Sequence, residues 1–299
     1  MHTGLSFWIG FHVAVLLLLA LDLFVFHREE RAISMREAAL WSVAWVALSL
    51  AFAAYIYMAK GPAKGVEFIT GYVIEYSLSA DNLFLFIMIF ACFQVPARNQ
   101  HRVLLWGILG ALVMRGAMIG IGVQLVRRFE WILYGFGVFL LLTGLRMFVK
   151  NESEAPGESL VIRLCRKWLR VTPEFHGSQF LVRTAAGWML TPLALVLVVV
   201  DVMDLIFAVD SIPAIFAVTT DPFIVYTSNI CAILGLRSLY FLLAGVAGRF
   251  KYLHYALAAV LTFIGAKMLV AGVFPIPAGV SLLVVGSLLA VAAICSLLF

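Results

Sequence analysis

Charged residues are scarce in this chain. Asp, Glu, Lys and Arg make up 12% of its 299 residues, whereas 64% are hydrophobic. Soluble domains are about a quarter charged and about half apolar, so this shortage excludes a soluble globular protein. The net charge of +5 is modest and the basic residues fall between the apolar runs, which argues against nucleic-acid binding. The composition predicts a single membrane domain over residues 1–299, with the lipid bilayer as its surroundings.

Cysteine and histidine are rare as well. The chain has four cysteines and six histidines, and its cysteines form no CxxC pair. Scattered cysteines in apolar runs are typically small buried hydrophobes, so neither a thiol redox centre nor a soft-metal site is expected. The first run is not preceded by the short charged region of a secretory signal, and no cleaved leader is expected.

Long apolar runs dominate the rest of the sequence. A helix needs about 20 apolar residues to cross a bilayer, and nine runs are candidates: residues 6–26, 38–58, 67–93, 103–126, 130–149, 189–215, 222–247, 252–272 and 276–298. We therefore expect an all-α polytopic membrane protein with about nine transmembrane helices. The intervening stretch 150–188 begins with NESEAPGES and continues with VIRLCRKWLRV, a pattern typical of a linker with a short basic surface helix.

The loop charges predict an orientation. Odd-numbered loops carry 13 Lys and Arg, against 4 in the even-numbered loops. Cytoplasmic loops carry the excess of basic residues. The odd loops, including the linker 150–188, should therefore be cytoplasmic, with the N-terminus outside and the C-terminus inside.

The chain also contains an internal repeat. Arg115 matches Arg237, Arg128 matches Arg249 and Gly144 matches Gly265, the last two pairs at a shared offset of 121 residues. An odd number of spans per unit inverts the second unit in the membrane, an architecture typical of transporters whose site lies at the repeat interface. The two predicted units have three spans each and cover residues 67–149 and 189–272.

Acidic residues inside two apolar runs are the most informative feature. The third run contains GYVIEYSLSADNLFLFIMIF, and the sixth contains LVLVVVDVMDLIFAVDSIPAIF. A carboxylate near the bilayer centre costs about 2.5–3.5 kcal/mol, so five of them would cost about 12–18 kcal/mol. A purely structural protein has little reason to carry that cost, which favours a buried cation site. Its candidate ligands are Glu75, Asp81, Asn82, Asp201, Asp204 and Asp210.

Helical geometry separates the acids within each run. Glu75 and Asp81 are six residues apart, about 240° around a straight helix, and Asp204 and Asp210 have the same spacing. To meet at one ion, each helix would have to unwind near its second acid. Broken helices are tolerated at membrane depth where they line a site.

The ligand chemistry indicates the class of ion. Pro213 has no N–H and would free the carbonyl of Val209, beside Asp210. Carboxylates, the Asn82 amide and a backbone carbonyl are hard oxygen donors, which suit Mn²⁺, Mg²⁺ or Ca²⁺ better than Cu or Zn.

Two other readings of the acids stay open. They could form a proton relay without metal, or structural ion pairs with Arg115 and Arg237, which also lie in apolar runs. Two arginines cannot neutralise five acids, so negative charge remains for a cation.

The chain resembles the TerC family of integral membrane proteins, and its Alx-like branch most closely. The segments that carry the resemblance are GYVIEYSLSADNLFLF and DLIFAVDSIPAIFAVTTDPFIVYTSNICAILGLRSLYFLLA. The resemblance implies a Mn²⁺ exporter of the bacterial inner (cytoplasmic) membrane, in a family named for tellurium resistance. Asp201 stands where close relatives often carry Glu. The family's metal-motif positions correspond to Glu75, Asp81, Asn82, Asp204 and Asp210.

Other functions compete with Mn²⁺ export. Oxygen ligands do not separate Mn²⁺ from Ca²⁺ or a broader range of divalent ions. A non-transporting factor that delivers Mn²⁺ to exported proteins or aids membrane assembly is a further alternative. An enzyme is not expected, because the GxGD motif of intramembrane aspartyl proteases is missing around both Asp81 and Asp210. The sequence leaves the driving force, with proton exchange as one candidate, and the oligomeric state open.

Overall fold

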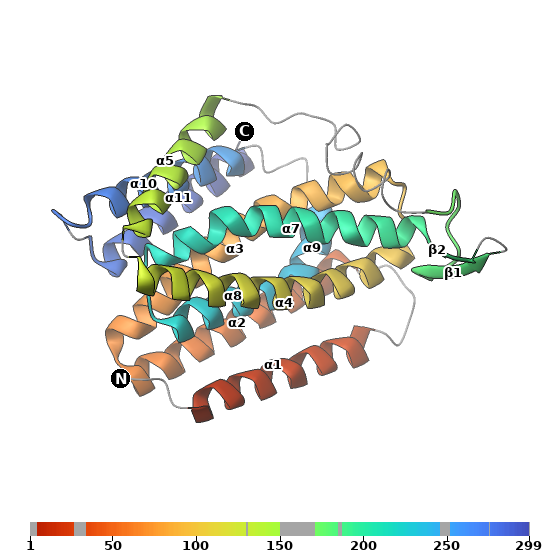
Figure 1. Cartoon of the computed structure of the whole chain (residues 1–299), viewed down its shortest axis with the longest axis horizontal. Coiled ribbons are helices and arrows are strands. Elements are labelled where there is room, and N and C mark those ends of the chain that lie inside the picture. Colours follow the sequence, from red (N-terminus) through yellow and green to blue (C-terminus); the bar gives the residue numbers. More distant parts are fainter. Residues whose placement is uncertain are drawn as a thin grey trace.

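The protein is an all-α polytopic membrane protein, as predicted (Figure 1). Its structure, a computed structural model, describes residues 5–26, 34–129, 131–149, 171–184, 187–245, 252–274 and 276–298. The helices are α1 (Leu5–Phe26), α2 (Met35–Lys60), α3 (Pro62–Cys92), α4 (Ala97–Arg128), α5 (Ile132–Val149), α7 (Pro192–Phe216), α8 (Pro222–Leu234), α9 (Leu236–Ala244), α10 (Leu253–Val270) and α11 (Ala278–Leu298).

Each predicted span coincides with a helix or with the α8–α9 pair. In the described part of the chain, α2, α3, α4, α7 and α11 are long and apolar enough to cross a membrane. Helices α8 and α9 pass the same test together and are bent by 42° at their junction. The apolar parts of α1, α5 and α10 are shorter, so the number of crossings stays a prediction.

Capping side chains and prolines mark the starts of several helices. Thr191 and Asp221 each accept a hydrogen bond from a backbone N–H of the helix that follows, at 3.4 and 3.0 Å. Proline occupies the first position of α3, α7 and α8, where its missing N–H costs nothing because that N–H has no partner within the helix. These signals explain why the long apolar sequence divides where it does.

Four helices form the centre of the bundle. Helices α3 and α4 each pack against both α7 and α8, so the four surround a common interior. Helix α1 runs along the outside and contacts α8, while α5, α10 and α11 gather in a second group beside α7 and α3 (Figure 1). The predicted repeat units therefore interleave, with helices of one unit contacting helices of the other.

Helices α5 and α10 pack closely through glycines. A Cβ added to Gly144 would lie 2.6 Å from the Thr262 nitrogen and 2.8 Å from the Ala258 oxygen. A Cβ added to Gly265 would lie 2.7 Å from the Gly137 oxygen and would also crowd Leu141. The two sets of contacts are equivalent, because residues 144, 262 and 258 of the first set correspond, at a spacing of 121 residues, to residues 265, 141 and 137 of the second. A two-fold axis between the helices would produce such reciprocity, although the inverted repeat itself stays a prediction.

A short β-hairpin, which the sequence analysis did not predict, precedes α7. Strands β1 (Leu181–Thr184) and β2 (Gly187–Leu190) pair antiparallel. The segment before β1 is bound to α4, because Arg102 donates a hydrogen bond to the Ser178 hydroxyl at 2.9 Å and its guanidinium lies 5.2 Å from the centre of the Phe180 ring. The predicted basic surface helix at 159–171 lies almost wholly outside the described residues.

Candidate cation site

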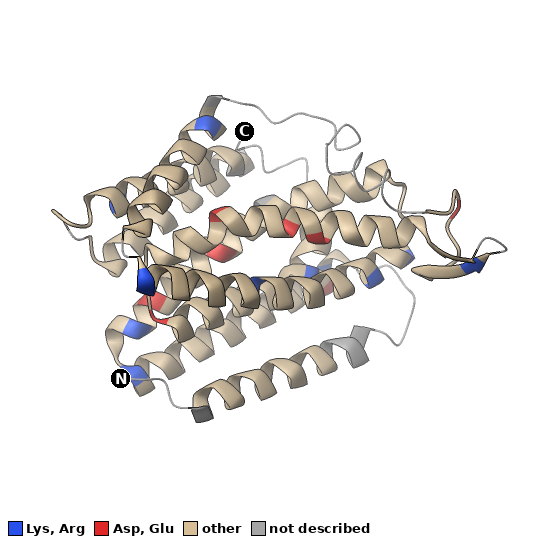
Figure 2. Cartoon of the chain, in the orientation of Figure 1, with Lys and Arg blue, Asp and Glu red and all other residues tan. Residues whose placement is uncertain are grey.

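A buried arginine joins the two acidic helices. Arg115 on α4 donates two hydrogen bonds to Asp204 on α7, at 3.0 and 2.7 Å, and a third to Glu75 on α3. Glu75 is 0% exposed, Arg115 1% and Asp204 5%. Figure 2 shows acidic positions part-way along the long helices, away from both ends of the bundle. The first acid of each motif therefore meets its counterpart through Arg115.

The charges of this cluster do not balance. One guanidinium faces two carboxylates, which leaves a formal charge of −1 if both are ionised. Ser79 adds a neutral hydrogen bond to Glu75 at 3.3 Å, and the second oxygen of Glu75 has no hydrogen-bond partner among the described residues. A buried carboxylate oxygen without a partner is costly. The cluster therefore retains both charge and an oxygen with which to attract a cation.

Asp201 lies one turn before Asp204 and packs against the glycine face of α4. A Cβ added to Gly110 would lie 3.0 Å from one Asp201 oxygen, and a Cβ added to Gly107 would lie 3.6 Å from the other. One of these oxygens also has no hydrogen-bond partner in the described part of the chain. The glycines leave room for a carboxylate at this position, where larger side chains would fill the space.

The second acids occupy other positions. Asn82 and Asp210 are half-buried, and Asp81 belongs to α3 although its side chain lies outside the described residues. The expected unwinding is wrong, because α3 and α7 run unbroken through these positions. The second acid of each motif consequently stays on a different face from the first, and among the described side chains no three His, Cys, Asp or Glu form a group that could hold a metal ion. The six-residue site stays a prediction.

Local hydrogen bonding and burial explain why α3 and α7 stay continuous at these positions. The Ser77 hydroxyl donates to the carbonyl of Val73 one turn earlier at 2.6 Å, a hydrogen bond that leaves the helix continuous. In α7, Pro213 is only three residues from the end of the helix, and every residue from 211 to 216 is buried. Burial of these side chains outweighs the backbone hydrogen bond that proline removes.

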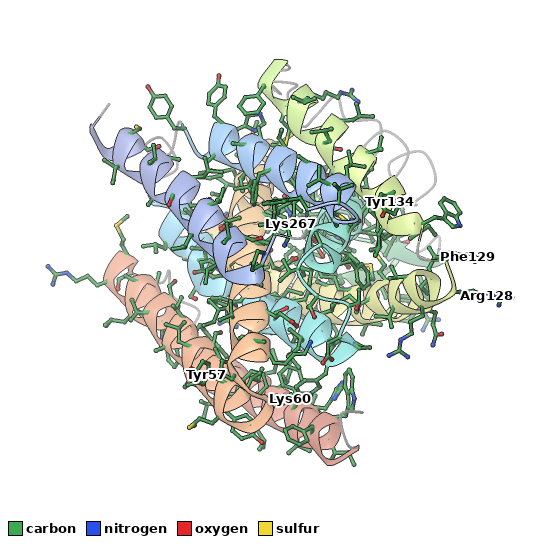
Figure 3. The ribbon with its side chains drawn as sticks, turned by 90° about the vertical axis from the view of Figure 1, so that its left-hand side faces the viewer. Tyr57, Lys60, Arg128, Phe129, Tyr134 and Lys267 are labelled. Atoms are coloured by element: carbon green, nitrogen blue, oxygen red, sulfur yellow. The ribbon has the colours of Figure 1, made fainter. Side chains whose placement is uncertain are left out.

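Two adjoining cavities lie at the end of the bundle where α2 ends and α8 begins. They measure about 810 and 450 Å³ and share Trp8, Val123, Arg127 and Pro222. Figure 3 looks onto this end of the molecule, with Lys60 near the bottom of the view and Arg128 at its right-hand edge. By the loop-charge prediction this end faces the outside.

A polar network also lies at this end. Lys64 is 2.6 Å from Glu67 and 3.8 Å from Asp221. Thr219 donates a hydrogen bond to Glu67 at 2.5 Å. The network links the start of α3 to the start of α8, beside the larger cavity.

Sequence reasoning missed Asn229 as an interior polar residue. Ser211 and Asn229 are 1% and 0% exposed, and neither side chain has a hydrogen-bond partner in the described structure. The available signal was a Ser-Asn pair, Ser228 and Asn229, inside an otherwise apolar run. The role of Arg115 was partly anticipated, although it binds two acids rather than one.

Apolar helices around an interior of paired charges define a polytopic membrane protein with a polar core. The chain belongs to the TerC family: residues 60–299 match the family described as "Integral membrane protein TerC family". This confirms the resemblance seen in the acidic motifs.

Its relatives include named membrane proteins. The chain is 50% identical over 292 residues to the Escherichia coli (strain K12) protein described as "Putative membrane-bound redox modulator Alx", covering 94% of this chain and 91% of that protein. A Photorhabdus laumondii protein with the same description is 49% identical over 294 residues, covering 95% and 92%. An uncharacterized membrane protein of Myxococcus xanthus is 48% identical over 292 residues, covering 97% and 92%. No solved structure matches the chain.

Proposed function

We propose that this protein exports Mn²⁺ across the bacterial inner (cytoplasmic) membrane, with buried carboxylates as ligands. The supporting observation is the cluster of Arg115, Glu75 and Asp204, which is buried between three helices and keeps an excess of negative charge. The proposed ligands are those named from the sequence: Glu75, Asp81, Asn82, Asp201, Asp204 and Asp210.

The cluster suggests how a divalent cation is bound and released. Arg115 occupies the carboxylates that the ion needs, so the ion and the guanidinium compete for Glu75 and Asp204. Two positive charges cannot share one small dry site at low cost. Displacement of Arg115 opens the site, and its return, or protonation of the carboxylates, expels the ion. Proton exchange would then be coupled to transport.

The direction of transport follows from the proposed orientation. With the N-terminus outside and the C-terminus inside, the two adjoining cavities lie on the outer side and provide the exit. The hairpin β1–β2 lies at the opposite end of the bundle (Figure 1), which in this orientation would face the cytoplasm. We propose no enzymatic activity for this chain.

The relatives' description as redox modulators fits within this proposal. Cys92, Cys231 and Cys295 are free thiols, and the described residues contain no disulfide. Control of a redox-active metal would affect the redox state of the membrane without a thiol centre. Delivery of Mn²⁺ without transport, and export of Ca²⁺ or a broader range of divalent ions, are the competing functions.

Flux through the purified, reconstituted protein tests the proposal. Proteoliposomes and protein-free liposomes would be loaded with Mn²⁺ or Ca²⁺, with and without a pH gradient, and release measured with an external dye. We expect protein-dependent Mn²⁺ release that the pH gradient accelerates. Mn²⁺ binding without release would favour the delivery function, and equal rates for Ca²⁺ would favour the broader exporter.

A further inference from the structure

Asn229 on α8 is a buried polar residue in the interior of the protein. It is 0% exposed, and neither its amide nitrogen nor its amide oxygen has a hydrogen-bond partner among the described residues. Burying a polar amide without a hydrogen-bond partner is energetically costly. Its neighbour Thr227, also 0% exposed, instead donates to the carbonyl of Phe223 at 2.7 Å. The difference calls for an explanation at Asn229.

The position of Asn229 on α8 shows where its side chain is directed. Ser228 faces α3, because a Cβ added to Gly71 would lie 2.9 Å from the Ser228 hydroxyl. Tyr226 faces α4, because a Cβ added to Gly116 would lie 3.4 Å from the Tyr226 ring. At 100° per residue, Asn229 falls in the sector between these two directions. It is therefore directed into the interior that α8 shares with α3 and α4.

Two more buried polar atoms without a hydrogen-bond partner lie on α3 and α7. Gly71 also contacts Ile215 of α7, since an added Cβ would lie 3.7 Å from that side chain. One turn along α3 from Gly71 is Glu75, with its unpartnered oxygen, and one turn before Ile215 on α7 is Ser211, with its unpartnered hydroxyl. Helices α3 and α7 run in opposite directions, so both steps lead the same way along the bundle (Figure 1).

The smaller of the two cavities reaches this region from the outer end. Its lining includes Gly116, next to Arg115, and Tyr226, one turn before Asn229. The Tyr226 hydroxyl is hydrogen-bonded to His12 of α1 at 3.1 Å, and the two rings stack with centroids 5.4 Å apart. Tyr226 therefore lines the cavity one turn away from Asn229.

We infer that Asn229 is a substrate-contacting residue on the outward path, between the acidic cluster and the Tyr226 side of the cavity. Its amide oxygen, the Ser211 hydroxyl and the free oxygen of Glu75 are hard donors that suit a partly hydrated divalent cation. None of the three is hydrogen-bonded to another, which leaves each free to contact an ion or its water. This inference rests on the proposed function, because it assigns a step to the same transported ion.

The test compares two substitutions of similar size change on one helix. Asn229→Leu removes the unpartnered amide, and the control Thr227→Val removes a hydroxyl that is satisfied within the helix. Both variants and the wild type would be reconstituted, and Mn²⁺ release and thermal unfolding with and without Mn²⁺ measured. We expect Asn229→Leu to lose about tenfold or more in Mn²⁺ release, in proportion to the loss of one oxygen contact, while Thr227→Val stays close to wild type.

Thermal unfolding separates a transport role from a structural one. Without Mn²⁺, Asn229→Leu should be at least as stable as the wild type, because an apolar side chain replaces a costly amide. A variant that unfolds at lower temperature and yet releases Mn²⁺ normally would overturn the inference. If Asn229→Leu fails to fold, Asn229→Ser serves as the second variant. It keeps a small oxygen donor, so it should retain part of the wild-type Mn²⁺ release. Complete loss of release by this variant would also count against the inference.

The same release measurements distinguish a wrong assignment of Asn229 from a wrong proposed function. If wild type, Thr227→Val and Asn229→Leu all release Mn²⁺ equally, the inference is wrong and the exporter proposal stands. If the wild type itself releases no Mn²⁺, both are wrong.

Discussion

Arg115 sets the charge balance of the protein's interior. A single guanidinium holds two carboxylates from different helices, all three essentially inaccessible to solvent. Such an arrangement adds little net stability compared with an apolar core, but removing one partner leaves uncompensated buried charge. The residue therefore couples the electrostatics of the site to the packing of α3, α4 and α7.

Replacing Arg115 should strongly destabilise the protein. We expect Arg115→Met to lower the free energy of unfolding by about 3–5 kcal/mol, because Glu75 and Asp204 would lose their shared cation. Thermal or denaturant unfolding in detergent measures the effect. Adding Glu75→Gln and Asp204→Asn to this variant should recover part of the loss, since no excess charge then remains buried.

A surface arginine provides the matched control. Arg146 on α5 is exposed, and Arg146→Met should change stability by about 0.5 kcal/mol or less. Equal losses at Arg115 and Arg146 would show that the buried ion pairs do not govern stability.

At the level of single residues, the sequence identified the charged groups better than their arrangement. Burial of Glu75, Asp204 and Arg115 followed from charges within apolar runs. Their pairing could not be predicted, because it depends on the relative rotation and depth of three helices. Asn229 was missed because one amide in an apolar run is a weak signal without neighbours in space.

At the scale of helices, α5 and α10 pack closely because each contributes a glycine to their contact. Gly144 and Gly265 each leave no room for a Cβ against the partner's backbone. Without a hydrophobic driving force between helices in lipid, small residues that permit such contact are a main source of helix association.

Filling this contact should separate the two helices. Gly144→Ala should lower stability by about 1–3 kcal/mol, the usual cost of overpacking. Gly135→Ala on the same helix, where an added Cβ meets nothing within 4 Å, should be neutral or stabilising by up to about 1 kcal/mol, because alanine is the better helix former. Unfolding midpoints of the two variants in detergent provide the comparison.

The reciprocal position offers a second comparison. Gly265→Ala should resemble Gly144→Ala in size and sign, since the two glycines meet equivalent backbone atoms. If Gly135→Ala proved as damaging as either, the loss would come from helix backbone effects and not from the contact.

The helices were largely predictable and their details were not. The lengths of the apolar runs predicted the positions of α2, α3, α4, α7 and α11 to within six residues at each end. The unbroken course of α7 through Pro213 was not predicted, because it depends on tertiary burial near the helix end. The β1–β2 hairpin was missed because its eight strand residues lie between a charged linker and a long apolar run.

At the scale of the whole molecule, orientation is the property that the loop charges predict most directly. A reporter that fluoresces only in the cytoplasm should be active when fused after residue 299 and inactive when fused before residue 1. The physical reason is the excess of Lys and Arg in the odd-numbered loops. The opposite pattern would invert the molecule and place the two cavities on the cytoplasmic side.

The basic linker serves as the control for this prediction. Neutralising the Lys and Arg residues of 159–171 should alter orientation or expression and leave Mn²⁺ binding by correctly inserted protein unchanged. Loss of binding in that variant would place ligands outside the acidic helices.

Membership of the TerC family and the helical class were predictable because both are written in long, specific stretches of sequence. Substrate identity is harder to predict, because hard oxygen donors bind several divalent ions. The arrangement of the second acids is harder still. Asp81 and Asp210 lie about 240° around their helices from the first acids, so what they contact depends on neighbouring helices.

Mn²⁺ release by Asp81→Asn and Asp210→Asn in proteoliposomes tests the central claim most directly. Each change keeps the shape of the side chain and removes one negative charge, and a neutral amide replaces the hydration of a divalent ion poorly. We expect both variants to be folded, because a buried amide costs less than a buried carboxylate, and to release Mn²⁺ no faster than protein-free liposomes. Release by both at the wild-type rate would contradict the account, since the buried acids would then not be the metal site.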